Sequence, residues 1–371
     1  MINRFLKTAS KEQIKFIPSE TTRLQNQNFQ KTVALSLKSA REQLALWIDP
    51  WLDRLFMLQP SLLIPTWILM AAGLGAGEGS LTPDLFWRVS WDLTTGLLFL
   101  GGTLIAGAAL IFVGETPRRP AGIQGLPALS EPRRPTGPAA LRAGLALLTA
   151  GLFLVTPAGI LALAAGLALF ALWGLVYTYL PPLGWAGPFV TTPIHGLAAG
   201  CLFLLGWSAS GAAAGDGATL MLPYVLVITA MAALTGIYPI TGKASNQSSQ
   251  AVISRVVVAI STILTLAAGM LGYYSGDPMI STSAAIIIPF QLVALVYLRP
   301  VDIFRTVRYA LLIMTVFVGA RYPLLYLPVL AAFYLSRYYY QRRYGHPYPT
   351  MEGNLWNMGR GLEFSGDLRE D

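Results

Sequence analysis

The pattern of hydrophobic positions along the chain is a series of long apolar runs separated by short polar segments. A helix needs about 20 apolar residues to cross a membrane, and most of the runs reach or approach that length. The pattern therefore predicts an all-α protein with about nine transmembrane helices. We expect them at residues 61–78, 94–114, 140–156, 158–179, 189–210, 218–238, 252–273, 280–298 and 307–337.

Two of these boundaries depend on a few residues. Only Thr156 and Pro157 separate the third run from the fourth, and about 38 residues in a row would be too long for one crossing at about 1.5 Å per residue. The last run contains the sequence Arg321-Tyr322-Pro323. It is either one long element or two shorter ones, and a break at this point would bring the C-terminal tail back to the side where the run begins.

Composition supports a polytopic membrane protein. Hydrophobic residues make up 54% of the chain and charged residues only 12%, against about 25% charged in soluble proteins. The net charge of +8 comes from basic residues in the N-terminal arm and in alternate loops. Lys and Arg accumulate in this way in the cytoplasmic loops of membrane proteins. We therefore expect an integral protein of a bacterial inner membrane, with a cytoplasmic N-terminus and no nucleic-acid partner.

The pattern also predicts three regions. Residues 1–57 form a basic arm, in which apolar positions at helical spacing between 29 and 56 predict an amphipathic helix at the membrane interface. Residues 58–338 form the transmembrane domain, and residues 339–371 form a polar tail. The arm and the tail are the candidate docking segments for other membrane protein subunits.

Three stretches resemble one family of membrane enzymes. LQPSLLIPTWILMAAGLG at 58–75 resembles the first helix of the UbiA-type membrane prenyltransferases, and YLSRYYYQRRYGHPYP at 334–349 resembles the ending of some bacterial branches. GARYPLLYL at 319–327 is also similar. The resemblance implies a UbiA-like helical bundle. It also implies a site in which aspartate-rich motifs after the second and sixth helices hold magnesium, which bridges the diphosphate of a prenyl donor.

This chain departs from both motifs. At the first position, in 109–131, one acid remains, Glu115, and it is followed by Arg118 and Arg119. A single carboxylate beside two arginines favours an ion pair over a metal site. The second motif falls in GIYPITGKA, where alignment with the family places Pro239, Thr241 and Lys243 at the three acid positions.

Other residues could bind a ligand. His195 lies in a transmembrane run, where it is a candidate ligand for haem or chlorin, although a histidine hydrogen-bonded to a neighbouring helix is commoner; ionisable groups inside a membrane are often functional. Four basic residues are candidates for binding a phosphate or a lipid headgroup without metal, or are ordinary basic loop residues: Arg118, Arg119, Lys243 and Arg299.

The lost acids favour one of several functions. The first is a catalytically degenerate UbiA-like protein that is a lipid- or isoprenoid-binding or scaffold subunit of a membrane complex, with no cofactor predicted. The second is a divergent prenyltransferase that transfers a prenyl group from a prenyl diphosphate to an aromatic or lipid acceptor. Magnesium would then be needed, with Glu115, Asp302 and the arginines handling the diphosphate. A transporter of unrelated fold would need midplane charges, which are scarce apart from Arg321.

Overall fold

The structure is a computed structural model that describes residues 48, 51–52, 55–56, 58, 60–78, 92–115, 138–177, 187–212, 214–241 and 248–344. The chain divides into two compact units, Met1–Arg54 and Leu55–Asp371, and every helix named below belongs to the second. The predicted amphipathic helix at 29–56 lies almost entirely outside the described residues. The predicted division at 57/58 and 338/339 stays a prediction.

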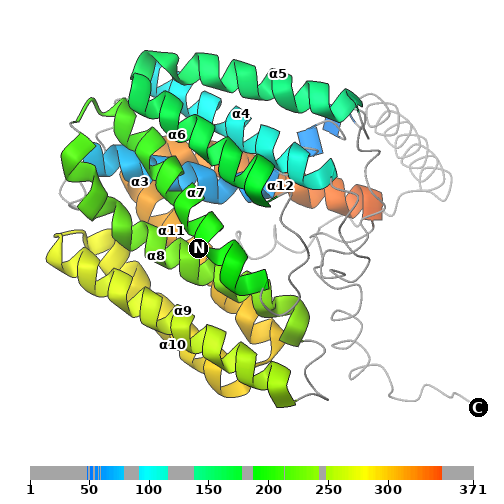
Figure 1. Ribbon diagram of the computed structural model, residues 1–371, viewed down its shortest axis with the longest axis vertical. Helices are drawn as coiled ribbons and strands as arrows, with labels where there is room; N and C mark the ends of the chain where they lie inside the picture. Colours follow the sequence, from blue (N-terminus) through cyan, green and yellow to red (C-terminus); the bar gives the residue numbers. More distant parts are fainter. Residues whose placement is uncertain are drawn as a thin grey trace, which may run out of the picture. The chain divides into compact units, whose positions relative to one another are not determined.

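All regular elements among the described residues of the second unit are helices (Figure 1). They are η1 (Pro60–Leu63), α3 (Ile64–Gly77), α4 (Leu93–Glu115), α5 (Pro138–Val155), η3 (Thr156–Ala158), α6 (Ile160–Phe170), the π-helix η4 (Ala171–Tyr177), α7 (Gly187–Ala209), α8 (Ala214–Thr241), α9 (Ser248–Tyr274), α10 (Pro278–Tyr297), α11 (Pro300–Arg321), η7 (Pro323–Leu325) and α12 (Tyr326–Tyr344).

The predicted membrane helices are present, with ends that differ by a few residues. Seven helices in the described part are long and apolar enough to cross a membrane, and two more, Ile64–Gly77 and Ile160–Val176, are apolar but shorter. The predicted break at Thr156 is confirmed, because η3 and Gly159, whose φ is 93°, separate α5 from α6. The protein is therefore an all-α integral membrane protein.

For the last predicted run, 307–337, the structure has the second of the two alternatives, two shorter helices with a break between them. The chain breaks at Tyr322, between α11 and η7, where Pro323 has no N–H to donate to the helix before it. The hydroxyl of Tyr326 donates to the carbonyl oxygen of Val316 at 2.9 Å, and a side chain at Gly319 would collide with the Tyr326 ring. These contacts fold the start of α12 back onto the end of α11.

Two contacts, one before η1 and one after α3, define the two ends of the bundle. The ring of Phe56, just before η1, stacks on Tyr339 of α12 with 3.9 Å between centroids and 9° between planes. At the other end of α3, Glu78 accepts a hydrogen bond from Tyr322. We call these the tail end and the far end. Since consecutive helices alternate in direction, α4, α8 and α12 all finish at the tail end.

Small residues allow the central helices to pack closely. A Cβ atom at Gly73 of α3 would overlap the Phe203 carbonyl of α7, and one at Gly206 of α7 would overlap the Met70 carbonyl of α3. Close backbone approach of this kind is typical of glycines spaced along membrane helices. Through it α3 becomes the centre of the bundle, where it also packs against α4, α8 and α11, while α5 and α10 lie on opposite sides (Figure 1).

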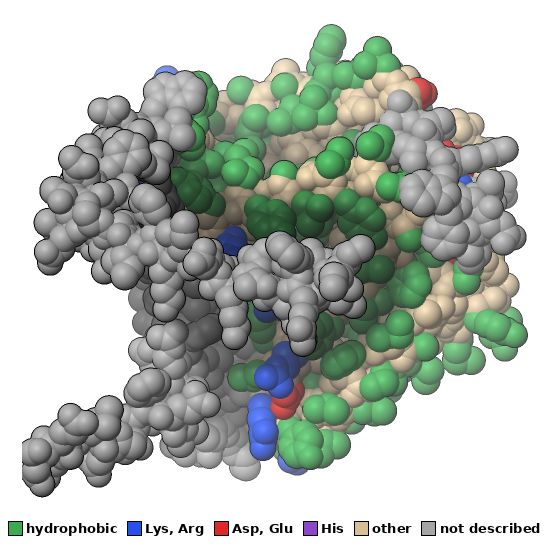
Figure 2. Space-filling model, turned by 180° about the vertical axis from the view of Figure 1, so that it is seen from behind, with side chains coloured by type: hydrophobic (Ala, Val, Ile, Leu, Met, Phe, Trp, Pro, Cys, Tyr) green, Lys and Arg blue, Asp and Glu red, His purple; other side chains and the backbone are tan. Residues whose placement is uncertain are grey.

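The outer surface suits a bilayer. Large apolar side chains such as Phe153, Ile160 and Val296 are more than two-thirds exposed, and Figure 2 shows a face that is mostly hydrophobic with few charged side chains. On α9, about 18 residues separate the exposed Arg255 from the exposed Tyr273, which is about 27 Å of helix. That length matches a hydrocarbon core of about 30 Å.

Candidate functional site

The tail end is where the sequence predicts a ligand site, and only part of it is described. The backbone of α4 finishes at Glu115, and α8 finishes at Thr241, so the two segments that match the family's motifs do leave the bundle at the same end. The side chain of Glu115 lies outside the described part of the chain, as do Arg118, Arg119 and Lys243. Their roles stay predictions.

The turn between α10 and α11 is the described part of this end. Leu298 takes a left-handed conformation, with φ 51°, and closes α10, and Pro300 begins α11. Arg299, between them, is exposed, and its guanidinium carbon lies 5.1 Å from the centroid of the Tyr297 ring. The turn thus presents one predicted headgroup-binding arginine at the surface, held by a cation–π contact.

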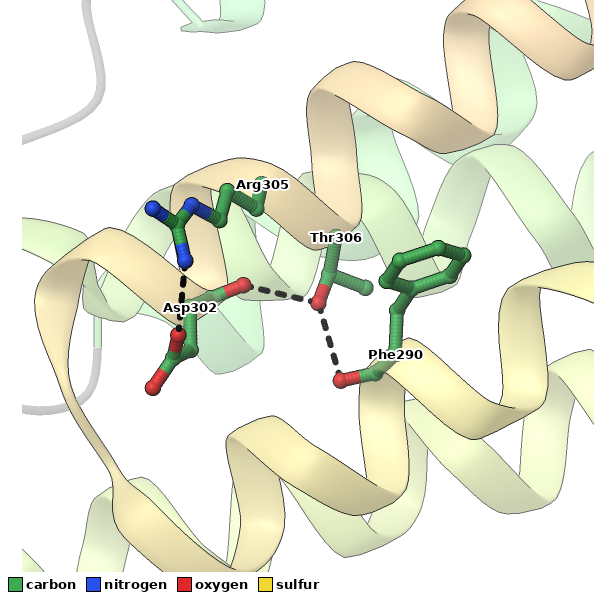
Figure 3. A network of polar contacts seen from close by, with 4 residues as sticks. All are labelled: Phe290, Asp302, Arg305 and Thr306. Carbon is green, nitrogen blue, oxygen red and sulfur yellow. Dashed lines mark hydrogen bonds and ion pairs between the residues drawn. The ribbon is translucent and has the colours of Figure 1, made fainter.

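The first turns of α11 hold the acid that the sequence singles out here, Asp302. Its carboxylate lies 3.8 Å from the Arg305 guanidinium, and the carboxylate side chain is 13% exposed. Figure 3 shows how the same turn is fixed: the Thr306 hydroxyl lies 2.8 Å from the Asp302 carbonyl oxygen and 3.2 Å from the Phe290 carbonyl oxygen of α10. Asp302 is therefore placed beside a cation, not beside a second acid.

This arrangement does not fit a magnesium site of the family's kind. Bridging a diphosphate takes several carboxylate oxygens around the metal. Within the described residues, no three His, Cys, Asp or Glu side chains lie close enough together to hold a metal ion. At the tail end the described part contributes Asp302 alone, already paired with Arg305.

His195 lies in the tail-end half of α7, beside the π-helix η4. The Trp173 indole donates its N–H to Nδ1 of His195 at 3.1 Å, and because an indole nitrogen can only donate, Nδ1 accepts and the ring proton sits on Nε2. A histidine that binds a metal through Nε2 usually donates from Nδ1 instead. The geometry therefore favours a histidine bonded to a neighbouring helix, and a ligand role for His195 stays a prediction.

The far end holds a charged cluster that the sequence analysis did not assemble. The Tyr322 hydroxyl donates to Oε2 of Glu78 at 3.0 Å, and the Arg321 guanidinium lies 3.7 Å from the same oxygen. Arg321 and Tyr322 are almost fully buried. Burial, with the Glu78 charge beside it, raises the pKa of Tyr322, so its phenol stays protonated and donates.

A second buried pair lies at the same end. The Tyr224 hydroxyl of α8 donates to Oδ2 of Asp277 at 2.7 Å, and Oδ1 of Asp277 accepts from the backbone N–H groups of Met279 and Ile280, which caps α10. Burial raises the pKa of Asp277, although these hydrogen bonds oppose the shift. In the sequence, these two groups are marked only by Arg321 inside an apolar run and by the acids Glu78 and Asp277 at helix ends.

A third polar group lies inside the membrane region, between α9 and α10. The Gln291 amide donates to the Thr265 hydroxyl at 2.8 Å and to the Ser261 carbonyl at 3.4 Å. All three side chains are fully buried, and neither the Ser261 hydroxyl nor the Gln291 amide oxygen has a hydrogen-bond partner. These residues tie two neighbouring helices together, and nothing in the hydrophobic pattern marked them.

Comparison with known proteins places the fold. No protein-family profile matches the chain, and no curated protein matches its sequence. Among solved structures, a digeranylgeranylglyceryl phosphate synthase is 16% identical, with a TM-score of 0.50 over 72% of this chain and 96% of that one. A UbiA homologue from Archaeoglobus fulgidus, solved with GPP and Mg²⁺, is 16% identical, with a TM-score of 0.51 over 74% and 99%.

These similarities confirm the fold that the sequence predicts. The chain is an all-α membrane protein with a UbiA-type helical bundle. At this level of identity the likeness concerns the fold, and the chemistry of the site depends on the residues that this chain places there.

Proposed function

We propose that the protein is a catalytically degenerate UbiA-like membrane protein that binds an isoprenoid or another lipid and serves as a subunit of a membrane complex. The observation that carries the proposal is the loss of acids at the second motif position, where Pro239, Thr241 and Lys243 stand. An allylic diphosphate is polyanionic and leaves only when its charge is stabilised. Without the carboxylates that would hold magnesium, that stabilisation is lost.

Basic side chains replace the acids at this end. Lys243 stands at a former acid position, Arg118 and Arg119 follow Glu115, and Arg299 is exposed on the α10–α11 turn. Arginine binds phosphate oxygens directly through charge-assisted hydrogen bonds. These residues support metal-independent binding of an anionic headgroup, with the apolar chain among the helices or in the surrounding bilayer.

The distribution of charge supports the proposed orientation. Arg142, Arg255 and Arg299 are exposed near the tail end, whereas the far end has Glu78 and the buried Asp277, and its described arginine, Arg321, is buried beside Glu78. Basic residues accumulate on the cytoplasmic side of membrane proteins. We therefore place the tail end on the cytoplasmic side of a bacterial inner membrane, the side on which the sequence predicts the N-terminus.

Purification from native membranes tests the complex. The full chain would be isolated in a mild detergent, and the proteins and lipids that accompany it would be identified by mass spectrometry. We expect a stoichiometric set of other subunits, together with a bound isoprenoid or phospholipid. A protein that is isolated without partners or lipid would contradict the proposal.

Ligand binding separates this function from the divergent prenyltransferase. The purified protein would be titrated with GPP, the ligand of the Archaeoglobus fulgidus homologue, and with an anionic phospholipid, each with magnesium and with a chelator. We expect phospholipid binding that does not change when magnesium is removed, and the same result for Glu115→Gln. GPP binding that needs both magnesium and Glu115 would favour the enzyme.

A further inference from the structure

The tail end presents exposed arginines from several helices. Arg255 is in the first two turns of α9, Arg299 and Arg305 are at the start of α11, and Arg337 is in the last two turns of α12. We call these four residues the arginine rim. Figure 2 shows a few basic side chains beside one acidic side chain on a largely hydrophobic part of the surface. The acid described at this end, Asp302, is only 13% exposed and already lies beside Arg305.

The polar tail begins at this same end. Stacking of Tyr339 on Phe56, with Tyr340 edge-on to the Phe56 ring at 6.0 Å, fixes the last turns of α12 beside η1. The helix finishes at Tyr344. The chain therefore leaves α12 at the end of the bundle where α11, the helix that carries Arg305, begins.

The charge of the following segment is opposite to that of the rim. Residues 345–371 contain five acids against two arginines, a net charge of −3, whereas residues 1–344 have a net charge of +11. Acids and basic residues are thus segregated, with the most acidic part of the sequence attached where the described surface is most basic. The five acids are Glu352, Glu363, Asp367, Glu370 and Asp371.

The length of the segment sets how far its acids can reach. A chain of 27 residues has a root-mean-square span of about 29 Å as a coil. Tethering gives its acids an effective concentration in the millimolar range, so several weak pairs can act together. Pairs between exposed charges are screened by salt over about 10 Å at 0.1 M, and the contact should therefore depend on ionic strength.

We infer that residues 345–371 dock on the arginine rim and cover it. The segment then acts as an internal competitor, because Arg299 cannot hold an anionic headgroup or an acidic partner while it is paired with a carboxylate of the tail. This inference extends the proposed function by adding regulation to the headgroup site. The docking itself is a property of the chain alone and does not require the lipid or the partner.

A distance measurement on the full chain tests the docking. Spin labels would be attached at Val296→Cys, an exposed position beside the rim, and at Ser365→Cys in the tail, with Cys201→Ser removing the native thiol. In neutral-lipid nanodiscs at about 50 mM salt we expect a short, narrow distance, which broadens at about 500 mM as the charges are screened. A broad distribution at both salt concentrations would overturn the inference.

Matched variants identify the charges involved. Arg299→Gln with Arg305→Gln should release the tail at low salt, as should Glu363→Gln with Asp367→Asn, while Arg142→Gln, on α5 and outside the rim, should leave the distance unchanged. A label pair at Val252→Cys and Val296→Cys reports whether the helices still pack. If the rim variants keep the short distance, the tail docks elsewhere and the inference is wrong.

Lipid binding gives a second, independent readout. Removal of residues 345–371 should increase the affinity for phosphatidylglycerol several-fold, measured in detergent by native mass spectrometry. If the truncated and full chains bind it equally, the tail does not compete for the headgroup site. If neither binds any lipid, the proposed function fails, although the distance measurement still decides the docking.

Discussion

Tyr322 donates a hydrogen bond to Glu78 at 3.0 Å, across 244 positions of the sequence. The bond joins the end of α11 to the end of α3, the central helix of the bundle. Arg321 contributes to the same contact, with its guanidinium 3.7 Å from Oε2 of Glu78. Together with the Tyr224–Asp277 and Gln291–Thr265 contacts, this group adds polar links to a bundle that is held mainly by apolar packing.

Removal of the Tyr322 hydroxyl should destabilise the protein. Tyr322→Phe deletes a bond to a carboxylate in a mostly buried setting, where loss of a partner costs about 1–3 kcal/mol. We expect the melting temperature in detergent to fall by several degrees. Tyr326→Phe is the control, because its hydroxyl bonds the Val316 carbonyl at an exposed position and should matter less. Equal losses in both variants would show that the far-end contact has no special role.

Asp277 should make stability depend on pH. Its pKa is raised in the folded protein because burial disfavours the charge. The folded state is therefore more stable when Asp277 is protonated. Its stabilising contribution is fully present below the ordinary pKa of about 4 and is lost as pH rises through the raised value. We expect thermal melting across this window to show that loss in the parent protein and a flatter profile in Asp277→Asn.

Asp92 provides a control of opposite sign. Its carboxylate accepts a hydrogen bond from the backbone N–H of Thr95 at 2.7 Å, and hydrogen bonding with Thr95 lowers its pKa. Its contribution is therefore present above the ordinary pKa and is lost as pH falls through the lowered value. The parent protein should lose this contribution at low pH, and Asp92→Asn should not show that loss. If both variants changed the profile in the same direction, burial would not be what distinguishes the two acids.

Sequence reasoning located the helices because apolar length is imposed by the bilayer. At 307–337 it left one helix or two open, and it missed the first turns of α11 for a local reason. The charges of Asp302 and Arg305 lowered the hydropathy of a segment that is helical from Pro300 onward, and their ion pair shows how the first turns accommodate charge. The break at Tyr322 depended on whether α12 could fold back, which the Tyr326 contact with α11 decides.

The candidate site was only partly predictable. The positions of the lost acids could be read from the sequence, since each follows a recognisable helix. The far-end cluster could not, because Glu78 and Tyr322 meet only when α3 and α11 pack side by side. Gln291 and Thr265 are similar: both lie within apolar runs, and their pairing depends on the register between α9 and α10.

Close packing of α3 on α7 should make Gly206 irreplaceable. A Cβ there would overlap the Met70 carbonyl, and because backbone cannot move aside as a side chain can, Gly206→Ala should cost about 1–3 kcal/mol or more. Gly96→Ala on α4 is the matched control, since nothing lies within 4 Å of its added Cβ. That variant should be neutral or more stable by about 0.5–1 kcal/mol. Thermal melting of the two purified variants measures the difference, and similar melting temperatures would contradict this packing.

The polar group between α9 and α10 predicts stability changes of opposite sign at neighbouring positions. The Ser261 hydroxyl is buried without a partner, so Ser261→Ala removes a polar group that gains nothing from folding, and stability should rise by up to about 1 kcal/mol. Thr265→Val deletes the acceptor of the Gln291 amide at 2.8 Å, and stability should fall by about 1 kcal/mol, in the range of hydrogen bonds between membrane helices. Chemical denaturation in mixed micelles measures both. A loss in Ser261→Ala as large as that in Thr265→Val would mean that the serine hydroxyl has a partner after all, such as a buried water that bridges it to the Gln291 amide oxygen.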